Sequence, residues 1–193
     1  MKRQRITVKR LVLTALLAAL TAAGSSLRIP VPSVVGTSAF HLGNILCALS
    51  GILLGPWLGG LAAGLGSAIY DILNPLYISE CWITFLMKGA YGLAAGLVAW
   101  AGHTRWQAAA PGSYAKALIA TVTGAVTYAI LYLSKSYFYS GRFLHGLTHE
   151  AALLNVIDKL PATAFNAAVA IIGAPLLAIA ISNALQRSHL SIE

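Results

Sequence analysis

Long apolar runs, separated by short polar connections, occupy almost the whole chain. Polar and apolar residues do not alternate within these runs, and Leu and Ala are abundant, which favours helices over strands. The runs cover residues 11–26, 40–54, 58–73, 82–101, 115–133 and 154–185. A helix needs about 20 residues to cross the hydrocarbon layer, so the second and third runs are short for a span. The pattern predicts an all-α integral membrane protein, a bundle of six transmembrane helices formed by one domain, 1–193.

Composition and charge support this prediction and give an orientation. Of the 193 residues, 58% are hydrophobic and 9% are charged, whereas soluble domains carry about 25% charged residues. The net charge is +8, and five basic residues lie within residues 1–10. Basic residues beside a span stay in the cytoplasm, so six spans place both termini there. A cleaved secretory signal is the alternative for this N-terminus, but the equally apolar remainder favours a first span. No basic and aromatic face develops elsewhere, so nucleic-acid binding is not expected.

The predicted topology places the longer connections on the outer side. These are the loops 27–39 and 134–153 and the shorter segment 74–81, whereas 55–57 and a cytoplasmic loop, 103–114, lie inside. The outer segments hold more polar and aromatic residues than the inner ones. Loops that helices hold in place often carry binding chemistry. A binding site is therefore expected at the outer face.

Polar residues at membrane depth point to the same face. An ionisable group inside a span costs about 2.5–3.5 kcal/mol, so it normally faces a cavity or a partner. His41 and Asn44 are three residues apart and are expected to share one face of the second helix, and Asp71 and Asn74 repeat this spacing in the third. The predicted substrate-binding residues are His41, Asn44, Asp71, Asn74, Trp82, Lys88, Tyr91, Asn155 and Lys159.

Several of these residues have a simpler interpretation. Lys88 could pair with Asp71 inside the bundle, and His41 could be a helix-start residue at the interface. Tyr and Trp also collect at membrane interfaces without binding a ligand. A polar pocket open to the outside explains all of these residues together, and it is the interpretation that we adopt.

Small residues predict helix contacts. Ala15, Ala19 and Ala23 are four apart and line one face of the first helix, where another subunit's helix could pack. The glycines of the third and fourth runs, including Gly60, Gly64 and Gly89, are expected to pack inside the bundle.

Motifs of catalysis and metal binding are missing from the sequence. It contains no P-loop, HExxH or GxSxG pattern. His145, His149 and Glu150 superficially suggest a metal site but lack a further ligand, and Cys47 and Cys81 have no CxxC neighbour. We therefore predict no catalytic residues, no metal and no cofactor.

Three segments carry a resemblance to a known family. They read ALLAALTAA in the first run, HLGNILCALSGILLGPWLGGLAAGLGSAIYDILNP from His41 and WITFLMKGAYGLAAGL from Trp82. The part LLGPWLGGLAAG, with the pattern LLGPxxGxxxG, is the most specific. With the length and the six runs, the chain resembles the substrate-binding S component of energy-coupling factor (ECF) transporters of vitamins and other micronutrients.

The resemblance implies a multi-pass protein of the bacterial plasma membrane that is not itself an enzyme. The substrate, a small water-soluble vitamin or a modified-base precursor, would be held near the outer face beneath the loop 27–39. The implied partners are a transmembrane coupling subunit and two cytoplasmic ATPase subunits. Ala15, Ala19 and Ala23 match the alanine motif that docks to the coupling subunit in this family.

The sequence leaves the substrate and one competing function open. Asp71 or Glu80 could accept from an amide edge beside stacking aromatic rings, whereas Lys88 and His41 could attract a carboxylate; we favour a planar heterocycle. The alternative function is a self-contained secondary transporter or channel. Such a protein needs a polar pathway to both faces, whereas the polar residues here gather towards one.

Overall fold

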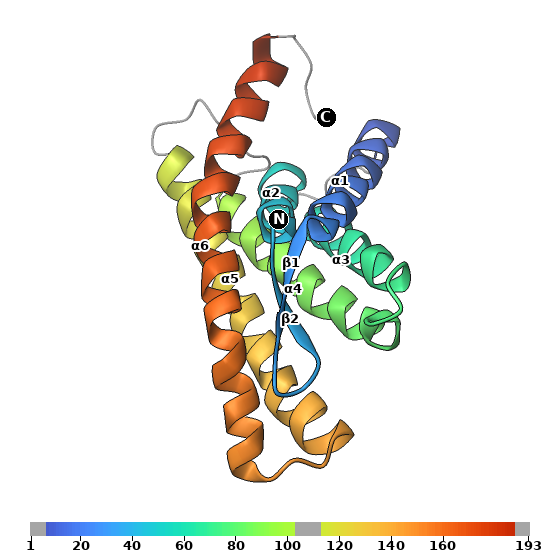
Figure 1. Cartoon of the computed structure of the whole chain (residues 1–193). Helices are drawn as coiled ribbons and strands as arrows, with labels where there is room; N and C mark the ends of the chain where they lie inside the picture. Colours follow the sequence, from blue (N-terminus) through green and yellow to red (C-terminus); the bar gives the residue numbers. More distant parts are fainter. Residues whose placement is uncertain (1–6, 103–112, 188–193) are drawn as a thin grey trace.

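A computed structural model describes residues 7–102 and 113–187 of the chain. This described part contains six α-helices and one β-hairpin (Figure 1). The elements are α1 (Val8–Ser26), β1 (Arg28–Pro32), β2 (Thr37–His41), α2 (Gly43–Leu54), α3 (Pro56–Ile72), the 3₁₀ turn η1 (Ile78–Glu80), α4 (Cys81–Ala99), α5 (Ser113–Ser134), the π-helix η2 (Lys135–Leu144) and α6 (His149–Arg187).

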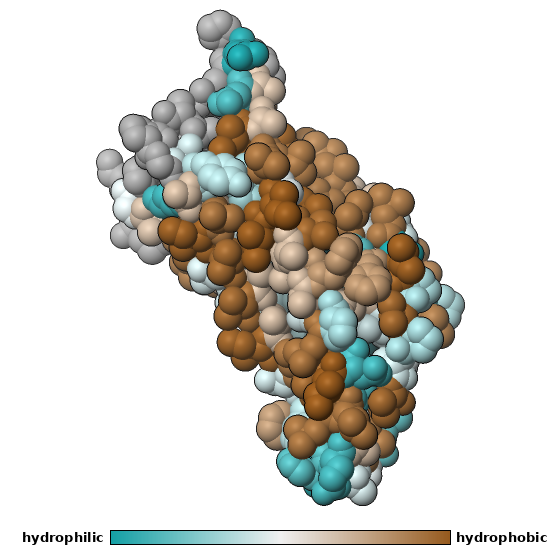
Figure 2. All heavy atoms as spheres, turned by 60° about the vertical axis from the view of Figure 1, so that its left-hand side comes forward, coloured by the Kyte–Doolittle hydropathy of each residue, from teal (hydrophilic) through white to brown (hydrophobic). Residues whose placement is uncertain are grey.

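Four helical segments of the described part are long and apolar enough to cross a membrane. They are Val8–Ser26, Ile78–Ala99, Ser113–Leu144 and His149–Leu185. Most of the face drawn in Figure 2 is apolar, which a lipid environment explains and water does not. The protein is therefore a largely helical membrane protein. The two remaining helices, α2 with 12 residues and α3 with 17, are shorter than these spans.

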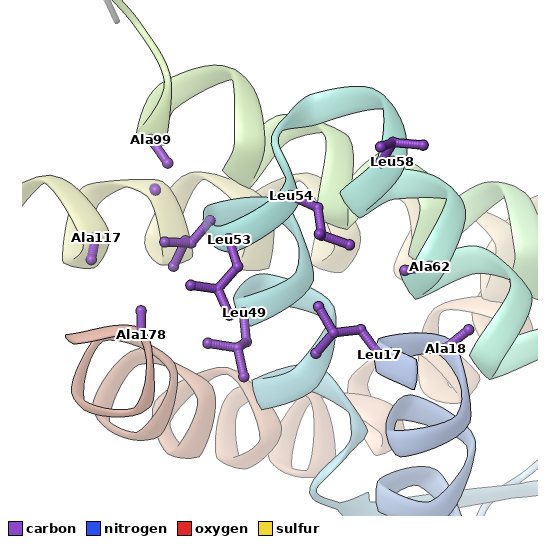
Figure 3. Close-up of a cluster of buried hydrophobic side chains, with 12 residues drawn as sticks. Leu17, Ala18, Leu49, Leu53, Leu54, Leu58, Ala62, Ala99, Ala117 and Ala178 are labelled. Atoms are coloured by element: carbon purple, nitrogen blue, oxygen red, sulfur yellow. The ribbon is translucent and has the colours of Figure 1, made fainter. Parts of the chain in front are cut away.

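The short helix α2 lies at the centre of the bundle. Ten of its 12 residues are buried, which is typical of a helix that is apolar on all sides. Figure 3 shows Leu49, Leu53 and Leu54 of α2 beside Leu17 of α1, with alanines of α5 and α6 completing the cluster. Its neighbours α1, α3, α4 and α6 therefore cover most of this helix.

Glycines bring α3 and α4 into close contact, as predicted from their spacing. A Cβ atom added to Gly60 would lie 2.9 Å from the carbonyl oxygen of Gly89, and one added to Gly64 would lie 2.8 Å from that of Phe85. A larger side chain would push the two backbones apart. Gly55 serves a different need, because its φ of 85° makes the sharp junction between α2 and α3.

The hairpin corrects the prediction for residues 27–41. The segment 27–39 was expected as a loop, and the second helix was expected to begin at Phe40. Instead β1 and β2 pair antiparallel, with Arg28 opposite His41 and Pro32 opposite Thr37. His41 is thus a strand residue and shares no helix face with Asn44. Gly36, at a φ of 69°, makes the turn.

The predicted loop 134–153 is also largely helical. The π-helix η2 continues α5, and α6 begins at His149, so Asp158 and Lys159 lie inside α6 rather than at its start. Burial explains the difference, because Ser136 and Ser140 of this polar segment pack inside the bundle. The Nδ2 atom of Asn155 donates to the carbonyl of Ser136 over 2.9 Å and ties η2 to α6.

Two further predicted segments are described only partly. Residues 103–112 of the predicted cytoplasmic loop 103–114 and residues 1–6 of the basic N-terminus lie outside the described residues. Arg10 belongs to α1 and is buried, where its Nη2 donates to the carbonyl of Leu54 over 2.7 Å. Its guanidinium also lies 5.6 Å from the ring centroid of Trp100.

Candidate ligand-binding site

A cavity of about 360 Å³ lies between the β-hairpin and the adjoining ends of the helices. Its wall contains residues of the hairpin, α3, η1, α4, α5, η2 and α6. Sites for small molecules usually enclose about 300–1,000 Å³ and combine apolar walls with a few placed polar groups. The volume therefore suits one small ligand. We call the end of the bundle that holds this cavity the hairpin end.

Arg28 forms one side of the cavity. Its guanidinium lies between two aromatic rings, 4.8 Å from the centroid of Tyr70 and 4.6 Å from that of Tyr77. Its Nη1 donates to the hydroxyl of Tyr70 over 2.8 Å. Stacking of this kind holds a planar cation in one orientation. Arg28 is therefore a fixed positive charge in the wall.

Lys88 and Asp71 provide charged groups from two adjacent helices. Lys88, which is 4% exposed, donates to Oδ1 of Asn44 and lies 3.9 Å from the ring centroid of Tyr128. Asp71, which is 8% exposed, lines the same cavity. The two side chains form no ion pair with each other within the described part of the chain. The cavity therefore offers a cationic donor and a carboxylate to a ligand.

Tyrosines of α4 and α5 form a stack of rings at the cavity. The rings of Tyr128 and Tyr132 are 5.6 Å apart at 18°, and those of Tyr91 and Tyr128 are 6.0 Å apart at 26°. Tyr128 and Tyr132 line the cavity, whereas the fully buried Tyr91 supports Tyr128 from behind. Nearly parallel rings present a surface on which a planar heterocycle can stack.

His41 faces the cavity from β2 and is held as a neutral imidazole. Its Nδ1 accepts a hydrogen bond from the backbone N–H of Gly43 over 3.1 Å, so the proton of the neutral ring lies on Nε2. Burial lowers the pKa of His41 well below 6.5, and the positive charges of Lys88 and Arg28 lower it further. His41 therefore offers a neutral N–H donor.

Three side chains of α6 bind the backbone of the hairpin. Asp158 Oδ2 accepts from the N–H of Val34 over 2.9 Å, and Asn155 Oδ1 accepts from that of Val35 over 3.2 Å. Asn166 accepts from the N–H of His41 over 2.9 Å and donates to a hairpin carbonyl over 2.8 Å. We call Asn155, Asp158 and Asn166 the α6 latch. The latch holds the hairpin against α6, over the cavity.

The structure brings four of the nine predicted site residues together in the cavity wall. These are His41, Asp71, Lys88 and Lys159. Asn44 lies behind the wall and binds Lys88, and Tyr91 lies behind Tyr128. Asn155 belongs to the α6 latch.

The two other predicted residues lie outside the wall. Asn74 donates to the hydroxyl of Tyr70 over 2.9 Å, so it contacts a residue of the wall from outside. Trp82 is 52% exposed and packs edge to face on Tyr139, with ring centroids 6.1 Å apart. The histidines that superficially suggested a metal site have separate partners, since His145 binds the carbonyl of Ser140 and His149 binds Tyr137.

The sequence prediction did not include Arg28, Tyr77, Tyr128 or Tyr132 among the site residues. The spacing of four between Tyr128 and Tyr132 places them on one helix face and was an available signal. Arg28 and Tyr77 lie in segments that were predicted to be connections, and spacing there does not predict the direction of a side chain.

The predicted docking alanines lie on the outer surface of α1. Ala15, Ala19 and Ala23 are exposed, while Leu17 and Thr21 of the same helix point into the bundle. The exposed alanines thus form a shallow stripe with room for a second helix.

A largely helical membrane protein with a cavity of this size and chemistry belongs to the class of membrane proteins that bind a small molecule. The family comparison is more specific: residues 5–183 match the model of the family described as "ECF-type riboflavin transporter, S component", and the chain belongs to this family. A curated relative, described as "Uncharacterized protein in gap 3'region" of Pyrococcus woesei, is 32% identical over 119 residues, which cover 62% of this chain and 72% of the relative.

Membership confirms the main predictions about function. The chain is the substrate-binding S component of an ECF transporter, a multi-pass protein of the cell membrane that takes part in transport and is not an enzyme. The resemblance to S components that rested on three sequence segments is thereby confirmed over nearly the whole chain.

Proposed function

We propose that this S component captures a flavin, either riboflavin or a close derivative, from outside the cell. The observation that carries the proposal is the cavity beneath the hairpin, which joins stacked tyrosine rings to donors and acceptors of hydrogen bonds. The family to which the chain belongs is named for riboflavin transport, which supports the same ligand.

A flavin has flat ring faces and one polar edge, and the residues of the cavity wall suit both. The fused rings stack on Tyr132, next to the face of Tyr128 that Lys88 covers. One edge of the ring system alternates carbonyl oxygens with an N–H group, so it needs both donors and an acceptor. Lys88 and the Nε2–H of His41 donate to the carbonyls, and Asp71 accepts from the N–H. Each of these side chains lines the cavity.

The proposed topology has six spans with both termini in the cytoplasm and the hairpin end outside. The basic residues that precede and begin α1 anchor this end of the chain at the cytoplasmic face. At 1.5 Å per residue, α3 is about 25 Å long and nearly crosses the hydrocarbon layer, whereas α2 is about 18 Å long and relies on the helices that enclose it. The cavity then opens from the outer half of the membrane.

Import requires partners that this chain does not supply. We propose that the stripe of Ala15, Ala19 and Ala23 docks on a transmembrane coupling subunit, which works with two cytoplasmic ATPase subunits. The exposure of the three alanines supports this assignment, because small residues let two backbones approach closely. The chain thus provides recognition, and its partners provide energy.

Titration of the purified chain with riboflavin tests the proposal. Stacking on tyrosines should quench flavin fluorescence, with saturation at one flavin per chain. Thiamin and biotin, which are also vitamins but lack the three-ring system, serve as controls and should not compete. Absence of quenching by a folded protein, or full displacement by thiamin, would contradict flavin capture.

Weakening the α6 latch should release the ligand faster. Removing the carboxylate in Asp158→Ala frees the backbone of Val34, and the loss of one charge-assisted hydrogen bond corresponds to about a tenfold increase in the dissociation rate. Stopped-flow fluorescence after mixing with excess competitor measures this rate. Asn183→Ala, an exposed change on the same helix far from the hairpin, is the matched control. An unchanged rate in Asp158→Ala would separate the latch from ligand retention.

A further inference from the structure

The charges around the cavity do not balance. Four cationic side chains line it, Arg28, Lys88, Lys135 and Lys159, against the two carboxylates of Asp71 and Glu80. With His41 neutral, four positive and two negative charges leave an excess of about two positive charges in the wall. Riboflavin is uncharged at neutral pH and cannot balance them. A ligand with an anionic group could.

Lys159 is the cation with the least protein compensation. Lys135 makes an ion pair of 2.6 Å with Glu80, and Lys88 binds Asn44. Lys159 is 4% exposed, yet no carboxylate, carbonyl or hydroxyl within the described residues accepts from its ammonium group. Its neighbour Asp158 already accepts from the hairpin N–H of Val34. Because Lys159 lines the cavity, its ammonium group is available to a ligand that supplies an acceptor.

The position of Lys159 suits one end of an elongated ligand. Its ammonium lies 5.9 Å from the ring centroid of Tyr132, one helical turn along α5 from Tyr128, where Lys88 sits. Lys135 and Glu80 line the same cavity as Lys159. A flavin whose polar edge lies beside Lys88 and Tyr128 can therefore direct its flexible ribityl tail towards Lys159.

We propose that Lys159, together with Lys135 of the same cavity wall, forms an anion subsite, and that the preferred ligand is a flavin with a phosphate on its ribityl tail. This inference rests on the proposed flavin capture. A phosphate monoester carries about −1.5 to −2 charges at pH 7 and three acceptor oxygens, which matches the excess charge of the wall and gives the ammonium of Lys159 an acceptor. The hydroxyl end of riboflavin can accept a hydrogen bond, but it carries no charge to balance the wall.

The test compares two ligands on the same purified chain. Riboflavin and its phosphate monoester, flavin mononucleotide, are titrated separately by fluorescence quenching at fixed ionic strength. The phosphate should bind at least about tenfold more tightly, as expected for one charge-assisted contact. Lys159→Gln should reduce this ratio to about one through weaker binding of the phosphate alone, and Lys159→Arg should retain the preference.

Two further variants test whether the preference for the phosphate depends on the cations of the cavity wall. Arg142→Gln removes an exposed cation at the same end of the bundle and should leave the ratio unchanged. Lys135→Gln should lower the ratio, and it provides a second measurement if Lys159→Gln does not fold.

The outcomes separate this inference from the proposed function. Riboflavin binding as tightly as the phosphate, or more tightly, would overturn the anion subsite and leave flavin capture intact. A phosphate preference that survives both Lys159→Gln and Lys135→Gln would overturn the assignment to these residues. If neither flavin binds the folded wild-type chain, flavin capture fails, and the anion subsite fails with it.

Discussion

Ala19→Trp should abolish flavin uptake while leaving flavin binding to the purified chain almost unchanged. Ala19 is exposed in the middle of the α1 stripe and points away from the cavity. An indole at this position fills the space that a helix of the coupling subunit would occupy, so docking is lost although the ligand site stays intact. Uptake of labelled riboflavin by cells with the complete transporter measures the first effect, and fluorescence quenching measures the second.

A matched tryptophan on another helix distinguishes docking from a general effect on the membrane protein. Ala115 is exposed on α5, which packs on α2, α4 and α6 rather than on α1. Ala115→Trp should therefore leave uptake intact. If Ala19→Trp transports normally, the stripe of α1 is not the docking surface. If it folds but no longer binds flavin, α1 serves the ligand site instead.

Lys88→Met should weaken flavin binding by about ten- to a hundredfold, which corresponds to the loss of one or two hydrogen bonds from a charged donor. Methionine approximates the length of the buried side chain and removes its ammonium group, so the change acts on recognition more than on packing. The affinity is measured by fluorescence quenching, and a thermal melt of the same sample establishes that the variant folds.

Two further variants test whether the effect of Lys88→Met comes from the cavity wall. Lys116→Met removes a lysine at the start of α5, outside the cavity, and should leave the affinity unchanged. Asp71→Asn retains the shape of the other charged group and should also weaken binding. Unchanged affinity in both Lys88→Met and Asp71→Asn would mean that the flavin edge does not lie at this part of the wall.

Hydropathy alone located the helices, because a helix in lipid must present apolar side chains over most of its surface. It could not locate the hairpin. Each strand has five residues, β1 contains two prolines, and the hairpin is held by α6 residues more than 100 positions away, such as Asp158, which lies 124 positions from Val34. Partners at that distance leave no periodic signal in the sequence.

The sequence predicted which residues lie at the membrane depth of the candidate site, but not the direction in which each side chain points. Membrane depth identified Asp71, Lys88 and Lys159, because burying a charge there requires a cavity or a partner. Trp82 was selected as an aromatic residue near the outer side that could stack on a ligand, and it is exposed instead. The helix face on which a residue lies depends on which neighbours surround the helix, and a single sequence does not provide that information.

The most direct test of flavin capture is to identify the small molecule that the chain retains when it is expressed alone in cells supplied with riboflavin. The purified protein is denatured, and the released compounds are identified by mass spectrometry. We expect a flavin in an amount close to one per chain, and the Lys88→Met variant should yield far less. Recovery of a different vitamin, or of no flavin from a folded protein, would contradict flavin capture.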